Sequence, residues 1–153
     1  MRAPRSNQGE LFQLGQLAAD LLGRFVEIQD GTRSWRVFLF VHIDFEQHAT
    51  DARAISGCLD SLLERLELLA DVAHSRTTED KFIQALGHYL CALRNSVGVY
   101  EHLTRVIGFH FRRQRLRGAF RVWRLRRDFD ATVETYRKHG LVFQRAWNAL
   151  EST

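Results

Sequence analysis

Residues 83–111 read IQALGHYLCALRNSVGVYEHLTRVIGFHF. In this stretch, mostly apolar side chains recur alternately three and four residues apart, at Ile83, Leu86, Leu90, Leu93, Val97, Tyr100, Thr104, Ile107 and Phe111. An α-helix completes one turn every 3.6 residues, so this spacing aligns the side chains along one face. We call such a row an apolar stripe, and it predicts a long helix with one buried face.

Three other segments carry the same pattern, at residues 11–28, 38–73 and, less regularly, 122–150. The breaks between stripes fall at Asp30-Gly31, at residues 75–78 and at Gly118, which we expect to cap the C-terminus of the third helix. The pattern predicts an all-α fold in a single domain, residues 1–153. We expect an elongated antiparallel four-helix bundle with helices at about 8–29, 34–74, 78–117 and 119–150.

The Asp30-Gly31 pair supports a second interpretation. Such a pair between stretches rich in β-branched and aromatic residues is typical of a β-hairpin turn, and residues 24–29 and 35–43 are stretches of this kind. A short β-hairpin at 24–43 is therefore the alternative to helix. The apolar stripe, which continues without a break from Phe38 to Leu69, favours the helix.

Composition narrows the class of protein. The chain has 153 residues, 45% of them hydrophobic, and a single proline, which suits a helical domain better than a turn-rich β-sandwich. Cys58 and Cys91 are too few for a disulfide framework, so we expect a reduced, cytoplasmic protein. The longest apolar run, residues 37–41, is much shorter than the roughly 20 residues of a transmembrane helix, so we expect no membrane span.

Charge is distributed unevenly along the chain. The formal net charge of +4 comes from 22 basic and 18 acidic residues. Residues 102–127 contain no acidic residue and nine arginines, at Arg105, Arg112, Arg113, Arg115, Arg117, Arg121, Arg124, Arg126 and Arg127. The rest of the chain has 13 basic and 18 acidic residues, so all of the net positive charge lies in this block.

The predicted hairpin of the two longest helices places this block at one end of the bundle. If the chain reverses near residue 76, the numbers of facing residues add up to about 153, so that Arg105 lies near His48 and Arg112 near Val41. Most carboxylates of the segment 34–74 then lie toward the other end. We therefore expect a basic end around the loops near residues 30 and 118. The alternative is that surface ion pairs neutralise these arginines.

A concentrated arginine surface attracts polyanions, and each guanidinium can bind a phosphate through two hydrogen bonds. The leading hypothesis is a non-enzymatic module that binds RNA or single-stranded DNA, or an acidic protein partner, within a larger nucleoprotein assembly. The expected binding residues are Arg112, Arg113, Arg115, Arg117, Arg121, Arg124, Arg126 and Arg127. Phe109, Phe111, Phe120 and Trp123 could stack on unpaired bases, but we expect most of these aromatic side chains to belong to the core.

A second hypothesis, from another functional class, is a protein-interaction or oligomerisation module. Long apolar stripes are typical of coiled coils, and surfaces rich in arginine and aromatic residues also suit protein interfaces. On this hypothesis the chain is a homo-oligomer or a subunit of a complex.

Arg105 and His110 provide a third hypothesis. Four residues separate them, a spacing that resembles the motif of HEPN-type ribonucleases, which are helical bundles. The resemblance implies metal-independent RNA cleavage, in which Arg105 would hold the scissile phosphate and His110 would exchange a proton. It covers six residues, and Val106 stands where that family usually has a polar residue.

Two pairs of residues have a spacing that metal ligands use. His42 with Glu46, and Asp71 with His74, are each about one helical turn apart. The pairs lie about 30 residues from each other on one predicted helix, so they cannot meet, and the other segments supply no matching ligands. We therefore expect neither a metal site nor a cofactor.

Overall fold

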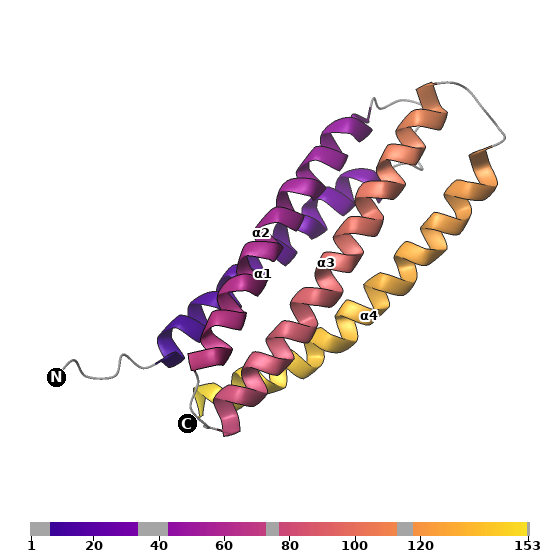
Figure 1. Ribbon diagram of the computed structural model, residues 1–153. Helices are drawn as coiled ribbons and strands as arrows, with labels where there is room; N and C mark the ends of the chain where they lie inside the picture. Colours follow the sequence, from indigo (N-terminus) through magenta and orange to yellow (C-terminus); the bar gives the residue numbers. More distant parts are fainter. Residues whose placement is uncertain (1–6, 34–42, 73–76, 113–117, 153) are drawn as a thin grey trace.

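Four helices make up the described structure: α1 (Asn7–Arg33), α2 (Phe45–Val72), α3 (Thr77–Arg112) and α4 (Ala119–Glu151). The computed structural model describes residues 7–33, 43–72, 77–112 and 118–152, and none of these residues lies in a β-strand. Successive helices run in opposite directions along one long axis (Figure 1). The predicted all-α antiparallel four-helix bundle is therefore confirmed.

Helix α1 continues through the Asp-Gly pair that suggested a turn. The alternative β-hairpin at 24–43 is wrong for residues 24–33, which are helical, while residues 34–42 lie outside the described structure. Gly31 serves close packing instead of a turn, because a Cβ atom there would lie 3.0 Å from Cε1 of His48 on α2. Contact between the helices thus prevails over the local turn propensity.

Helix α2 begins at Phe45, so the predicted start at residue 34 is wrong. Asp44 precedes the helix, and its carboxylate accepts hydrogen bonds from the backbone N–H groups of Glu46 (3.1 Å) and Gln47 (3.0 Å). These bonds form an N-cap, which satisfies donors that have no partner within the helix. The apolar stripe misled the prediction because its spacing continues across the cap.

The connection from α3 to α4 differs from the prediction at Gly118. Helix α3 is helical to Arg112, and residues 113–117 lie outside the described structure. Gly118 directly precedes α4 with a φ of −85°, which is not the left-handed conformation of the C-cap that we expected. A Cβ atom on Gly118 would overlap the ring of His110, so glycine allows the start of α4 to contact the end of α3.

Side chains from all four helices form one core. In α3 every stripe residue from Ile83 to Thr104 is buried, as the sequence predicts. Helix α3 also buries a second row, at intervals of seven residues, which the stripe does not include: Phe82, Tyr89, Ser96 and Leu103. Tyr89 in this row stacks on Phe143 of α4, with ring centroids 5.4 Å apart. Helix α3 therefore packs between α2 and α4 and has two buried faces.

The register between α2 and α3 matches the predicted hairpin. Three facing pairs define it along the length of the two helices: Phe45 with Gly108, Asp60 with Arg94, and Leu66 with Gly87. Their residue numbers add up to 153 or 154, so the geometric prediction is confirmed at both ends and in the middle.

Helices α1 and α4 meet where α1 begins and α4 ends. The Gln8 side-chain amide donates a hydrogen bond to the backbone carbonyl of Leu150 (3.0 Å). The rings of Phe12 and Trp147 meet edge to face, with centroids 5.1 Å apart. This end of the bundle is opposite to the end at which α3 gives way to α4 (Figure 1).

Candidate nucleic-acid interface

The start of α4 contains the described part of the predicted arginine cluster. Four of the eight predicted binding arginines are described, all near the start of α4: Arg121, Arg124, Arg126 and Arg127. Arg112 is the last residue of α3, and nothing is described of its side chain. Arg113, Arg115 and Arg117 lie outside the described residues.

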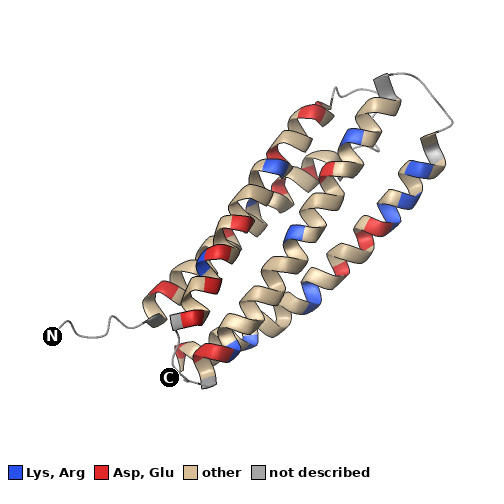
Figure 2. Ribbon diagram, in the orientation of Figure 1, with Lys and Arg blue, Asp and Glu red and all other residues tan. Residues whose placement is uncertain are grey.

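Acidic residues predominate on α2, and basic residues predominate at the start of α4 (Figure 2). Helix α2 carries six carboxylates and two arginines. Helix α4 has four arginines before its first carboxylate, Asp128. Because α3 packs between them, the carboxylates of α2 do not neutralise the arginines of α4. Among the described carboxylates, none forms an ion pair with Arg121, Arg124 or Arg127, whereas Arg126 lies 3.8 Å from Asp130.

This arrangement of charge is unfavourable for α4 by itself. The N-terminus of a helix carries a partial positive charge, and the first turn of α4 contains no acidic residue to balance it. Arg121, Arg124 and Arg127 are spaced three residues apart, so each guanidinium has a like charge one turn away. Sites that break local stability rules without a compensating contact are typically functional.

Aromatic side chains stand beside these arginines. Phe120 is 72% exposed and Trp123 is 55% exposed, and their rings stack with centroids 6.0 Å apart and planes 28° from parallel. The Arg127 guanidinium lies over the Trp123 ring, with Cζ 5.5 Å from the ring centroid. We call Phe120, Trp123, Arg124 and Arg127 the aromatic–arginine row.

The expectation that most of the four aromatic side chains belong to the core is wrong for those that are described. Phe109 is 47% exposed, like the two aromatic residues of the row, and the Phe111 side chain is not among the described ones. The apolar stripe of α4 already indicates which of its side chains are exposed. Val122, Leu125 and Phe129 point into the bundle, so Phe120 and Arg124 must point away from it.

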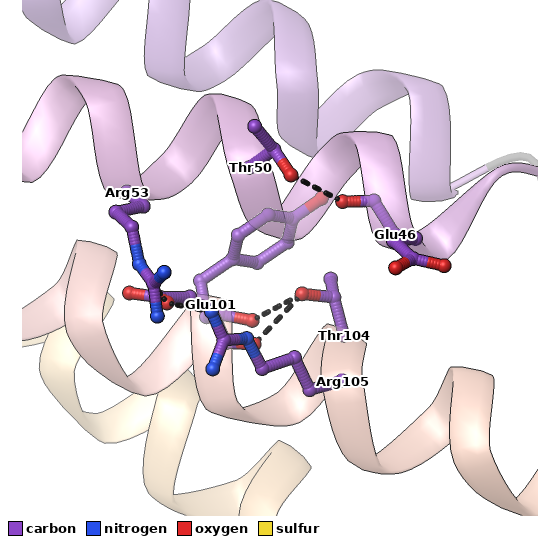
Figure 3. A network of polar contacts seen from close by, with 7 residues as sticks. Glu46, Thr50, Arg53, Glu101, Thr104 and Arg105 are labelled. Carbon is purple, nitrogen blue, oxygen red and sulfur yellow. Dashed lines mark hydrogen bonds and ion pairs between the residues drawn. The ribbon is translucent and has the colours of Figure 1, made fainter.

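Arg105 has a different environment from the α4 arginines (Figure 3). One of its terminal nitrogens lies 2.7 Å from Oε1 of Glu101, and Nε of Arg53 on α2 lies 3.1 Å from the same oxygen. The Thr104 hydroxyl donates to the carbonyl oxygens of Tyr100 (3.0 Å) and Glu101 (2.9 Å). Glu101 therefore holds two arginines from two helices, and Arg105 is already partnered.

A groove of about 630 Å³ lies between α2 and α3 beside this network. Its walls include Arg53 and Arg105 but also Glu46, and Glu101 pairs with both arginines. The groove is therefore close to neutral, unlike the start of α4.

The structure does not bring Arg105 and His110 together. Residues five apart on a helix are separated by about 140° around its axis. Arg105 accordingly lies on the side of α3 that faces α2, whereas the His110 ring packs beside Gly118 at the start of α4. Within this chain, the Arg105 guanidinium and the His110 imidazole therefore do not form a joint site.

No group of three histidine, cysteine or acidic side chains is close enough to hold a metal ion within the described ranges. Of the two pairs singled out in the sequence, Glu46 and Asp71 are described, and His42 and His74 are not. No helix that the structure describes is both long and apolar enough to cross a lipid bilayer.

Comparison of the chain with protein-family models, with curated proteins and with solved structures finds no match in any of the three.

Proposed function

We propose that this protein is a non-enzymatic helical-bundle module that binds RNA or single-stranded DNA through the start of α4. The observation that carries the proposal is the set of three exposed arginines, Arg121, Arg124 and Arg127, none of which pairs with a described carboxylate. We further propose that it acts in the cytoplasm, as a homo-oligomer or as one subunit of a nucleoprotein assembly.

Electrostatics supports a polyanion as the ligand. From Arg121 to Arg127 the helix rises about 9 Å, so the three guanidiniums can contact neighbouring phosphates of one strand. Their mutual repulsion and the helix dipole both destabilise the free surface and both favour a bound anion. Because bound phosphates release counterions, affinity should depend steeply on salt.

A matched pair of triple variants tests the proposal. Arg121→Gln, Arg124→Gln and Arg127→Gln together remove three positive charges from the start of α4. Arg137→Gln, Lys138→Gln and Arg145→Gln remove three exposed charges from the rest of the same helix and serve as the control.

Binding is measured by the fluorescence anisotropy of a labelled 12-nucleotide single strand over a range of salt concentrations. For the unaltered protein we expect log K to fall with log salt at a slope of about −3 to −4, as for four to six phosphates on a single strand. The first variant should bind at least about tenfold more weakly, with a shallower slope. An equal loss in both variants would mean that the charge acts without a defined surface, and the proposal would be wrong.

The second candidate function, protein interaction, is favoured by a different part of α4. Leu141 and Val142 are exposed apolar neighbours in its C-terminal half. If this face joins copies of the chain, sedimentation should show an oligomer that persists at high salt and that Leu141→Ser and Val142→Ser together dissociate.

A further inference from the structure

We infer that the aromatic–arginine row of α4 is a stacking site for unpaired nucleobases, so that the surface recognises base faces as well as phosphates. This inference rests on the proposed function, since the arginines bring the strand to the helix. It also rests on a separate observation: two exposed aromatic rings stack on each other beside these arginines.

The exposure of these two rings requires a reason. Phe120 and Trp123 are among the largest apolar side chains of the protein, and leaving such side chains in water forgoes stabilisation of the folded state. They are neighbours on one helix, so they form one apolar patch instead of two scattered residues. Arginines border the patch. Such a surface is unsuited to packing against an apolar core, and it suits a ligand that is both flat and anionic.

The contacts within the row order it for stacking. Arg127 lies over the Trp123 ring, and Trp123 in turn stacks with Phe120. The three groups thus form a short column along α4, with the more exposed ring, Phe120, at its N-terminal end. A nucleobase that stacks on Phe120 extends this column, and the indole is already held in place by its two neighbours. Preorganised aromatic side chains lose little conformational entropy when they bind.

The arginines of the row lie within reach of the backbone of a stacked nucleotide. Arg124 follows Phe120 by four residues, so the two side chains are neighbours on the helix surface, about 5–6 Å apart at Cβ. Stacking supplies contact with any base, because every base has a π-face, and the guanidinium supplies the phosphate contact. Bases within a continuous duplex are already stacked on each other, so the site selects unpaired bases.

Two probes with the same number of phosphates separate base stacking from charge. One is the fluorescently labelled 12-nucleotide oligodeoxyadenylate, and the other is a labelled 12-unit abasic strand. Both are titrated with the full-length chain and with the double variant Phe120→Ala, Trp123→Ala. The control is Val26→Ala, Leu68→Ala, which truncates two exposed apolar side chains on α1 and α2, outside both proposed surfaces.

We expect the unaltered protein to bind oligodeoxyadenylate at least about tenfold more tightly than the abasic strand, which corresponds to stacking of a single base. The Phe120→Ala, Trp123→Ala variant should bind both probes with the affinity that the unaltered protein has for the abasic strand. The control should retain the difference between the probes. Circular dichroism would show that each variant keeps its helical content.

A second measurement does not depend on truncating either ring. Oligodeoxyadenylate should quench tryptophan emission in the unaltered protein, the abasic strand should not, and Trp123→Phe should abolish the quenching while retaining most of the affinity. If both probes bind equally and neither quenches emission, the stacking site is wrong and the proposed function stands on charge alone. If neither probe binds, both proposals are wrong.

Discussion

Gly15 of α1 lies directly against the indole ring of Trp147 on α4, so close that a Cβ atom on Gly15 would overlap the ring. The indole cannot move away freely, because it also contacts Phe12 and Phe82 and donates a hydrogen bond from Nε1 to the Glu151 carboxylate (2.8 Å). Close approach of the two helices therefore depends on the absence of a side chain at this position.

Gly15→Ala should destabilise the protein by about 1–3 kcal/mol, the usual cost of forcing an extra methyl group into a packed contact. Gly23→Ala is the matched control, since a Cβ atom at Gly23 has no neighbour within 4 Å and alanine has the higher helix propensity. We expect this control to raise the free energy of unfolding by about 0.5–1 kcal/mol. Urea denaturation of both variants would test the contrast, and two changes of the same sign would contradict it.

Glu101→Gln should lower stability, because it removes the carboxylate that accepts contacts from Arg53 and Arg105. The two arginines are largely exposed, so the expected loss is only about 1 kcal/mol. Glu134→Gln is the control, an exposed carboxylate of α4 without an ion pair among the described residues. Because salt screens surface charges, the difference between the two variants should shrink in 1 M NaCl. A difference that is independent of salt would show that packing, not charge, is responsible.

Alkaline pH should destabilise the bundle through Tyr100. Burial raises the pKa of Tyr100 to about 12, and its hydroxyl donates to the Ile28 carbonyl oxygen (3.1 Å) and lies 3.0 Å from the Thr32 hydroxyl. The folded state thus holds this proton to a higher pH than the unfolded chain, in which tyrosine has a pKa near 10. The stabilisation is fully present below pH 10 and is lost as the pH rises toward 12.

The free energy of unfolding should therefore fall by about 2–3 kcal/mol on account of Tyr100 between pH 9 and pH 12. Burial raises the pKa of Tyr89 as well, so part of the alkaline loss remains when Tyr100 is replaced. Tyr100→Phe should be less stable than the unaltered protein at pH 8, because it lacks the hydroxyl contacts, and should lose less on the way to pH 12. Equal slopes of stability against pH for the two proteins would contradict this assignment.

Arg121→Glu should stabilise the free protein and weaken nucleic-acid binding. The substitution puts a negative charge in the first turn of α4, where the helix dipole favours it, and removes a like-charge neighbour of Arg124. We expect a gain of about 0.5 kcal/mol in the free energy of unfolding. Arg145→Glu, nearer the other end of the helix, should give no gain. A loss of stability in Arg121→Glu would mean that this arginine already has a stabilising partner.

Much of the fold follows from the spacing of apolar residues. The stripes of α1 and α3 identify buried residues from Leu11 to Phe25 and from Ile83 to Thr104. The near-equal lengths of the two long predicted helices lead to a register between them, which the contact of Phe45 with Gly108 confirms. Spacing alone does not show that α3 has two buried faces, because the second buried row includes the polar side chain of Ser96. This side chain is buried with a partner on α4, since it accepts a hydrogen bond from Thr132 (3.0 Å).

Helix ends were harder to predict than helix faces. The Asp44 cap and the helical Gly31 depend on competition between local hydrogen bonds and contacts with another helix, which a periodic pattern does not describe. For the candidate site, the sequence locates the arginines. The stripe through Val122, Leu125 and Phe129 also indicates that Phe120 and Trp123 are exposed, and the packing of Phe129 and Phe143 against α3 confirms it.

The hydrogen bond between Gln8 and Leu150 has a consequence for how the protein would be attached to anything else. It joins the first turn of α1 to the last turn of α4 at one end of the elongated bundle, and the start of α4, with Arg121, Arg124, Arg126 and Arg127, lies toward the other end (Figure 1). A tether joined to the first turn of α1 or to the last turn of α4 would therefore be attached at the end of the bundle opposite to these arginines.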